Sequence, residues 1–389
     1  MVAVRRDLHR HPELSFREKR TAGLVAERLQ GLGLKVRTEV GITGVVGDLR
    51  TGDGPTIALR ADMDALPVQE EPDHEFGSTV AGVMHACGHD AHTSGLLGAA
   101  RILADAAGSG ELPPGSVRFL FQPSEETVDA EGKSGATRMI DDGAMAGVDA
   151  VVGLHVGAHL PLGLVCVAPG TVMAGGEEIE VRVRGHAAHG ARPHEGIDAL
   201  LLASQGLLAS QQAVSRWIAP GDAGVVTFGR IEGGTAPNII ADNVRIRGTL
   251  RYFREEVRDR LRDAVRSAFA TADALGGSAQ VTFRPGYPPV VNDPEVTEAV
   301  RRAAGGVVGA DSVLRADRIL EAEDFGILAR QAPGAFFWLG AALPEPRQHH
   351  HPRFDIDESA LSLGAATLAA AAVELLESPP GAGEAPGTV

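Results

Sequence analysis

Short apolar runs alternate with helical segments over the first 170 residues of the chain. The runs at Thr56–Arg60, Ser116–Phe121 and Ala150–Leu154 have the length of buried strands. Between the first two of them, small apolar residues follow Thr93 and Ser94, either of which suits the N-cap of a buried helix. Alternation of this kind is typical of an α/β fold, with a largely parallel sheet and helices on both faces.

The N-terminal segment predicts two helices and two further strands. A helix over residues 2–11 is stopped by Pro12. The segment Ser15-Phe-Arg-Glu18 is a candidate capping box, and it precedes apolar residues at helical spacing that end at Gly31 and Gly33. Strand-like runs follow at Lys35–Val40 and Val45–Leu49.

The pattern changes at about residue 170 and predicts a second domain. Strands and helices now follow in the order β-α-β-β-α-β, which is the ferredoxin-like unit. We therefore expect an inserted ferredoxin-like α+β lid and dimerisation domain at residues 172–286. Its predicted elements are Glu177–Arg184, Ile197–Trp217, Val225–Ile231, Val244–Phe253, Arg254–Leu275 and Gln280–Phe283.

The first domain then resumes, so that residues 1–171 and 287–377 form one catalytic domain. Its later elements are a helix at Pro294–Ala304, a buried strand at Ala335–Leu339 and a capped helix at Asp357–Leu376. A second, shorter helix is expected earlier, at Ser134–Met145. The Pro- and Gly-rich residues 378–389 predict a disordered tail.

Composition and charge narrow the function classes. A net charge of −15 without a basic run argues against nucleic acid or an anionic membrane as a partner. No secretory signal is evident, and no segment reaches the roughly 18 uninterrupted apolar residues of a membrane span. Two cysteines cannot form a disulfide framework, so we expect a reducing cytoplasm as the location.

Polar residues gather where predicted strands end, which is where α/β sheets hold their ligands. The segment His85-Ala-Cys-Gly-His-Asp-Ala-His92 carries a thiol and three imidazoles, the donors that zinc prefers. The candidate metal ligands are Cys87, His89, Glu126, His155 and His350. Five ligands exceed one closed tetrahedral site and can serve two metal ions about 4 Å apart. The alternatives are a buried thiol with hydrogen-bonded histidines and a solvated glutamate pair.

Carboxylates beside these ligands have a place in the same chemistry. Glu125 adjoins Glu126 and is the candidate general base for a metal-activated water. Asp62, Asp64 and Asp90 are candidate partners that orient the ligating imidazoles. The motifs of serine hydrolases and of nucleotide-binding loops are missing from the sequence.

Together these motifs resemble the di-metal amidohydrolases and peptidases related to aminoacylase and bacterial glutamate carboxypeptidase. The most similar branch contains hippurate hydrolase, N-acyl-amino-acid amidohydrolase and the plant auxin-conjugate hydrolases. The resemblance runs through eight segments: 7–16, 60–67, 85–92, 121–126, 153–156, 185–194, 237–240 and 350–352.

The resemblance implies roles for individual residues. It makes Cys87, His89, Glu126, His155 and His350 the ligands of two divalent metal ions, zinc first, with manganese, cobalt or nickel as alternatives. It makes Glu125 the base. Among the neighbouring histidines, only His350 has the His-x-Pro spacing of the family. In the inserted domain, His189, Asn238 and Arg251 match positions that meet the substrate's oxyanion and carboxylate, and His189 acts there across a homodimer interface. A tetramer built from such dimers is the alternative assembly.

Three positions depart from the family pattern. Asp62 stands where related branches have a histidine, so Cys87 and His89 take over the ligand duty. His186-Ala-Ala replaces the common Lys-Gly-Gly, and Arg192 replaces a common Met. The last two departures lie in the predicted lid and therefore concern the preferred acyl group.

The leading hypothesis is a metal-dependent amidohydrolase that cleaves N-acyl-L-amino acids such as hippurate-like, N-acetyl or indole-acetyl conjugates. A dipeptidase, a carboxypeptidase or an N-acetyl-diaminopimelate-type deacetylase is the alternative in the same class. An inactive relative that binds amides or metals is the alternative from a different class.

Overall fold

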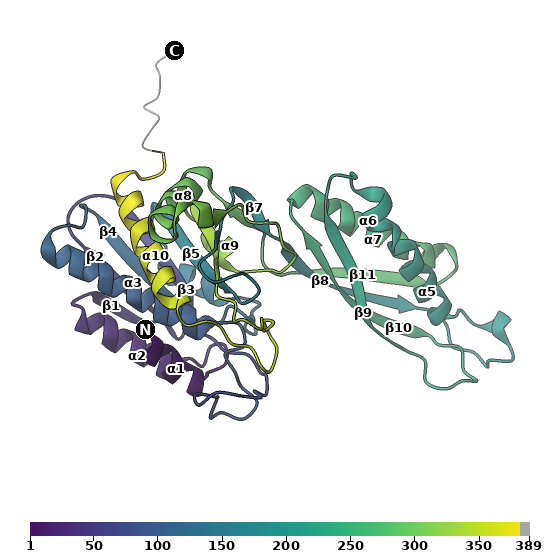
Figure 1. Cartoon of the computed structure of the whole chain (residues 1–389). Coiled ribbons are helices and arrows are strands. Elements are labelled where there is room, and N and C mark those ends of the chain that lie inside the picture. The colour runs from purple at the N-terminus through teal and green to yellow at the C-terminus, as the bar shows by residue number, and fades with distance from the viewer. Residues whose placement is uncertain (382–389) are drawn as a thin grey trace, which may run out of the picture. The chain divides into compact units, whose positions relative to one another are not determined.

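The computed structural model describes residues 1–381, which form two compact units (Figure 1). The first contains Met1–Gly170, Val291–Asp317 and the chain from Asp324 onward, and the second contains Thr171–Val290 and Arg318–Glu323. The second unit thus includes the predicted insertion, a few residues on either side and a later segment at 318–323. Of the predicted tail, residues 382–389 lie outside the described part of the chain.

The first unit is built on one mixed sheet with the strand order β1-β2-β4-β3-β5-β14-β6-β13. Four neighbours in the middle, β4, β3, β5 and β14, run parallel to one another. Their carboxyl ends therefore lie along the same edge of the sheet. The strands are β1 (Lys35–Val40), β2 (Gly44–Arg50), β3 (Thr56–Asp62), β4 (Ser116–Gln122), β5 (Ala150–Gly157), β6 (Val165–Cys166), β13 (Val313–Leu314) and β14 (Gly334–Gly340).

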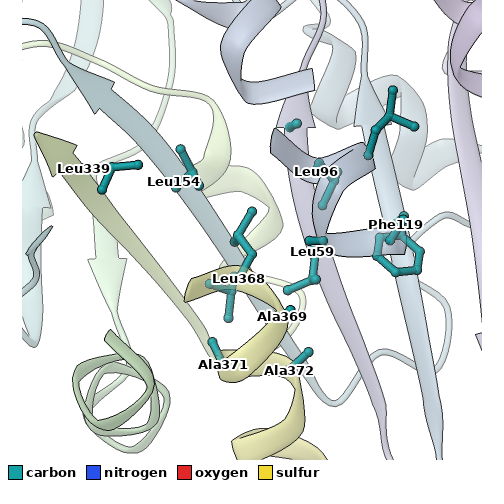
Figure 2. Close-up of a cluster of buried hydrophobic side chains, with 14 of the residues drawn as sticks. Leu59, Leu96, Phe119, Leu154, Leu339, Leu368, Ala369, Ala371 and Ala372 are labelled. Carbon is teal, nitrogen blue, oxygen red and sulfur yellow. The ribbon is translucent and has the colours of Figure 1, made fainter. Parts of the chain in front are cut away.

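Alternating side chains divide the sheet into two buried faces, because successive residues of a strand point to opposite sides. One face carries Leu59, Phe119, Leu154 and Leu339, which gather around Leu368 of a covering helix (Figure 2). The helices of this core are α2 (Lys19–Gly31), α3 (His89–Ser109), α8 (Pro294–Val308) and α10 (Ala360–Glu377), with α1 (Val2–Arg10) packed on α3. The short helices α4 (Gly135–Asp141) and α9 (Phe325–Leu328) pack against each other, and Phe325 of α9 contacts Phe336 on the opposite face. The predicted α/β fold with helices on both faces is confirmed.

One helix in the described residues, α10, is long and apolar enough to cross a membrane by length and composition. It packs against α3, α8 and the strands β3 and β5. Most of its apolar length is buried within this unit, as in a core helix.

The second unit is a four-stranded antiparallel sheet with helices. The strand order β11-β8-β10-β9, combined with the chain order, is that of the ferredoxin-like unit. A core around Ile179, Val181 and Ile246 packs against Leu261 and Phe269 of the longest helix. The elements are β8 (Gly175–Arg184), α5 (Ala199–Ser210), α6 (Gln212–Trp217), β9 (Gly224–Gly233), β10 (Asn243–Tyr252), α7 (Glu255–Ala274) and β11 (Ser278–Pro285). Two short strands, β7 (Gly170–Met173) and β12 (Val290–Asn292), form a separate two-stranded sheet.

Two local predictions are wrong. The segment Ile197–Trp217 is not one helix, because the helix is interrupted at Gln211, between α5 and α6. The capping box is also wrong, since Ser15 Oγ donates to Asp64 Oδ2 at 2.6 Å instead of closing the start of α2. The Glu18 carboxylate accepts from the backbone N–H groups of Phe16 and Ser124. The side chains of Ser15 and Glu18 thus form hydrogen bonds with residues distant in the chain.

Candidate metal centre

The predicted ligands come from the carboxyl ends of three parallel strands, β4, β5 and β14, and from the start of α3, while β3 supplies the candidate partner Asp62. β3 ends at Asp62, and β4 leads into the loop that carries Glu125 and Glu126. β5 contains His155 near its end, and the segment after β14 carries His350. The parallel sheet therefore brings together residues that lie far apart in the sequence.

The helix that carries His89 begins earlier than its apolar pattern indicates. Its N-cap is Gly88, with φ of 94°, so His89 is its first residue, and the expected N-cap at Thr93 or Ser94 is wrong. Thr93 Oγ1 instead donates to the main-chain oxygen of Asp62 at 2.8 Å. Gly88 is required here, because a Cβ at this position would lie 2.5 Å from Val156 Cγ2. The left-handed turn thus places Cys87 and His89 side by side.

The five predicted ligands form overlapping groups of converging donor atoms. Cys87, His89 and His155 form one group, and Cys87, Glu126 and His350 form another, each with its ligand atoms within 4.8 Å of one another. Cys87 Sγ lies 3.4 Å from His155 Nε2, and His350 Nε2 lies 3.3 Å from Glu126 Oε1. These separations match the edge of about 3.3–3.5 Å expected between two ligands of one tetrahedral zinc ion.

Two of these donor atoms have no hydrogen-bond partner within the described residues. His89 Nε2 and Glu126 Oε1 are both buried without such a bond, although His89 Nδ1 contacts the main-chain oxygen of Asp64 at 2.8 Å. Buried polar atoms normally find partners, because leaving one unpaired costs about 1–3 kcal/mol. A thiol, imidazoles and a carboxylate aimed at common points fit a borderline divalent metal. Cys87 and Glu126 each belong to two of the converging donor groups.

Glu125 is buried beside the same atoms. One of its carboxylate oxygens lies within 4.8 Å of a ligand atom of His89 and of Glu126. Ser124, directly before the two glutamates, is a non-glycine residue with φ of 45°. Such a conformation persists only where the surroundings enforce it, and here the Ser124 N–H donates to Glu18 at 2.9 Å.

Asp64 fixes the geometry of this loop relative to α3. It accepts from the backbone N–H groups of Glu125 and Glu126, each at 3.1 Å, and its Oδ1 lies 3.2 Å from His89 Nδ1. Burial would raise the pKa of Asp64, but its hydrogen bonds to His89 and Ser15 lower it. Asp64 therefore remains a carboxylate that orients His89 with Nε2 toward the other ligands.

Asp62 acts mainly on a histidine outside the predicted ligand set. Its Oδ1 lies 2.6 Å from His92 Nδ1, while His92 Nε2 accepts from the Val156 N–H at 2.9 Å. Both nitrogens of His92 are thereby used. Asp62 Oδ2 pairs with buried Arg60 at 2.7 Å. Burial alone would raise the pKa of Asp62, but the interactions with His89, His92 and Arg60 hold it well below its usual range.

Asp90 differs from expectation, because it does not orient a predicted ligand. Its Oδ2 accepts from Arg5 Nε at 3.2 Å and lies 2.8 Å from His9 Nδ1. Sequence reasoning also missed the roles of Arg60 and of Asp324, which pairs with Arg60 at 2.9 Å. The only available signal was the presence of Arg60 in the 60–67 motif.

Two neighbouring histidines approach Cys87 after β14. His349 Nδ1 lies 3.9 Å from Cys87 Sγ, and its Nε2 accepts from the Ala158 N–H at 3.3 Å. His350 has φ of 61°, and its ring is grouped with both Cys87 and Glu126. His350 thus lies in a group of converging donor atoms, and its role as a metal ligand stays a prediction.

The predicted substrate-binding residues lie in the second unit and do not form one cluster there. His189 and Asn238 occupy adjoining exposed loops, joined by a bridge from His189 to Ile239 and a 2.8 Å bond from the Gly190 N–H to the Asn238 oxygen. Arg251 lies opposite Gly176, near the other end of β8. With about 3.3 Å per residue, the eight steps from Gly176 to Arg184 span roughly 26 Å.

Comparison with known proteins places these features in a family context. The model of peptidase family M20/M25/M40 matches residues 58–374. Thermostable carboxypeptidase 1 of Saccharolobus solfataricus is 39% identical, over 96% of this chain and 95% of that protein. IAA-amino acid hydrolase ILR1-like 2 of Arabidopsis thaliana is 38% identical, over 97% of this chain and 85% of that protein. The crystal structure of Bacillus subtilis YXEP, described as a dinuclear metal-binding peptidase of the M20 family, has a TM-score of 0.85 and 33% identity, over 97% of each chain.

Proposed function

We propose that this chain, a metal-dependent hydrolase that belongs to peptidase family M20/M25/M40, cleaves the amide bond of N-acyl-L-amino acids. The observation that carries the proposal is the convergence of Cys87, His89, Glu126, His155 and His350 beside Glu125. The matched peptidase family and the relative named IAA-amino acid hydrolase support amide hydrolysis. The indole-acetyl conjugate named for the plant relative supports an N-acyl amino acid as the substrate class.

The residues divide the reaction between them. A pair of divalent ions held by the five ligands would polarise the scissile carbonyl and acidify a water molecule, with zinc favoured by the thiolate donor. The Glu125 carboxylate takes a proton from the attacking water and passes it to the leaving nitrogen. The backbone N–H of Glu125 donates to the Asp64 carboxylate, and this bond fixes the position of the base.

Residues of the inserted unit supply substrate recognition in this proposal. An arginine suits the free carboxylate of an N-acyl amino acid, because its guanidinium forms two parallel hydrogen bonds with such a group. Arg251 is our candidate for this contact, while His189 and Asn238 are candidates for stabilising the oxyanion. Arg251 lies far from His189 and Asn238 within the unit. This separation supports a homodimer in which one substrate meets Arg251 of one subunit and His189 and Asn238 of the other.

A direct test of the substrate class is a hydrolysis screen. N-acetyl, N-benzoyl and indole-acetyl derivatives of several amino acids would be compared with unsubstituted dipeptides, with zinc, manganese, cobalt or nickel supplied. We expect kcat/KM for at least one acyl derivative to exceed that for the dipeptides by tenfold or more, on the order of 1.4 kcal/mol in transition-state binding. Faster cleavage of dipeptides would favour the carboxypeptidase activity named for the archaeal relative.

We also propose that the inserted unit forms the dimer interface. Its sheet ends in the edge strands β9 and β11, whose outer backbone groups can pair with another copy. Light scattering at micromolar concentration should report a dimer, or a multiple of it. A strict monomer that retains full activity would contradict this proposal.

A further inference from the structure

A second group of metal-type side chains lies in the first unit, outside the catalytic constellation. It consists of His9 on α1 and of Glu70 and His74 in the segment between β3 and α3. The side chains of His9, Glu70 and His74 are 0%, 3% and 13% exposed. We name this group the His9 cluster.

We propose that the His9 cluster is a third divalent-metal site of the zinc type, separate from the catalytic pair. Its three ligand atoms are His9 Nε2, Glu70 Oε1 and His74 Nε2. Two imidazoles and one carboxylate are a donor set that zinc uses, with water in the fourth position.

The distances within the His9 cluster match those around one ion. His9 Nε2 lies 3.1 Å from Glu70 Oε1, and His74 Nε2 lies 3.4 Å from the same oxygen. Zinc bonds of about 2.0–2.1 Å in tetrahedral geometry place neighbouring ligand atoms about 3.3 Å apart. All three ligand atoms lie within 4.8 Å of one another. A zinc ion therefore requires only small shifts of the side chains.

The surroundings hold each ligand in the required orientation. His9 Nδ1 lies 2.8 Å from Asp90 Oδ2, which makes Asp90–His9 a carboxylate–histidine pair with Nε2 directed at the site. The His74 ring stacks on Phe76 with 3.8 Å between ring centroids, which fixes its plane. The Ser78 N–H donates to Glu70 Oε2 and leaves Oε1 for the site.

The carboxylates around His9 favour a positive charge at this position. Glu70 and Asp90 flank His9, while buried Arg5 is shared between Asp90 and two further carboxylates. Burial alone would lower the pKa of His9, but hydrogen bonds to Asp90 and Glu70 raise it to about 9. Both ring nitrogens of neighbouring His85 and Nδ1 of His74 have no hydrogen-bond partner in the described residues. These unpaired nitrogens lie on His74 and on neighbouring His85 and are not among the three proposed ligand atoms.

Such an ion would fasten three segments together: α1, the segment that carries Glu70 and His74, and the first turn of α3 through Asp90. Asp90 adjoins the proposed catalytic ligand His89, so the third ion would stabilise the helix start that carries the catalytic residues. It takes no part in the chemical step.

The test counts zinc bound to the full-length protein. After chelation, the protein would be reloaded with zinc and desalted, and its zinc content measured by mass spectrometry. We expect three equivalents for the wild type and two for His74→Phe, which keeps the ring that stacks on Phe76 but removes the nitrogen ligand. His11→Gln, at the end of α1 and half-exposed, is the matched control and should retain three.

A second background separates this proposal from the catalytic one. The triple variant Cys87→Ser, His155→Ala and Glu126→Gln should retain one zinc, and zinc should raise its melting temperature. Adding His74→Phe should abolish both effects. If His74→Phe leaves the zinc content unchanged in both the wild type and the triple variant, the third site is overturned. His9 would then be a protonated histidine paired with Glu70 and Asp90. Wild-type zinc content in the triple variant would instead contradict the proposed catalytic ligands.

Discussion

Arg60 is the buried cation on which the electrostatics beneath the metal centre depend. Its guanidinium contacts Asp62 at 2.7 Å, Asp324 at 2.9 Å and Gln122 at 2.9 Å, and all three charged side chains are fully buried. The substitution Arg60→Met keeps an unbranched side chain but leaves Asp62 and Asp324 without their shared positive charge.

The expected loss in the free energy of unfolding is large, because a broken buried ion pair leaves an uncompensated charge. Removal of one partner typically costs about 3–5 kcal/mol. Burial already raises the pKa of Asp324, and without Arg60 it should rise further, so that the folded variant takes up a proton. The folded variant then holds a proton that the unfolded chain releases above pH 4, and the penalty grows as pH rises. The difference from wild type should therefore be larger at pH 8 than at pH 5.5.

Urea unfolding of the metal-loaded protein measures this difference. The chain has two tryptophans, and Trp217→Phe leaves Trp338 of β14 as the reporter of the first unit. Arg118→Met on neighbouring β4 is the matched control, because its ion pair with Asp48 and its hydrogen bonds to the main-chain oxygens of Ala144 and Ala146 are partly exposed and should contribute less than the fully buried pairs of Arg60. The reasoning is refuted if Arg60→Met is no more destabilising than Arg118→Met, or if its effect is the same at both pH values.

Two further substitutions test the supports of the catalytic loops. Burial and the nearby Asp64 raise the pKa of Glu18 to about 7, so the folded state loses roughly 3 kcal/mol as pH rises from 4.5 to 7. Glu18→Gln should abolish this loss, and a pH-independent difference from wild type in urea unfolding would contradict it. Gly88→Ala should cost about 1–3 kcal/mol and lower metal affinity, because of its left-handed φ and the contact with Val156. Gly95→Ala in the same helix, with no atom within 4 Å of the added carbon, should be neutral or stabilising; equal effects of the two changes would refute this account.

The apolar periodicity of the sequence was sufficient to predict most strands and the fold class. β3, β4, β5 and β14 are short apolar runs, and their order along the chain alternates with helices, so a parallel sheet and its ligand-bearing edge could be predicted. The candidate ligands followed from their positions after these strands. His350 could be separated from His349 only through the His-x-Pro spacing.

The remaining features depend on contacts that no local pattern encodes. Ser15 and Glu18 have the spacing of a capping box, yet Ser15 bonds Asp64 and Glu18 bonds Ser124. The partner of Arg60 at Asp324 is distant in the chain. The true start of α3 at His89 depends on the left-handed Gly88, which apolar periodicity does not reveal. Tertiary hydrogen bonds thus override the local preference at Ser15 and Glu18.

The two adjacent glutamates provide the most direct test of the central claim, that Glu125 moves a proton while Glu126 holds metal. Metal content, KM and kcat would be measured for Glu125→Gln and Glu126→Gln side by side on the best substrate of the screen. We predict that Glu125→Gln retains its metal and a near-normal KM while kcat falls by about a hundredfold or more. Glu126→Gln should lose metal and activity together. Substantial turnover in Glu125→Gln, or loss of metal from it to the same extent as from Glu126→Gln, would contradict the assignment.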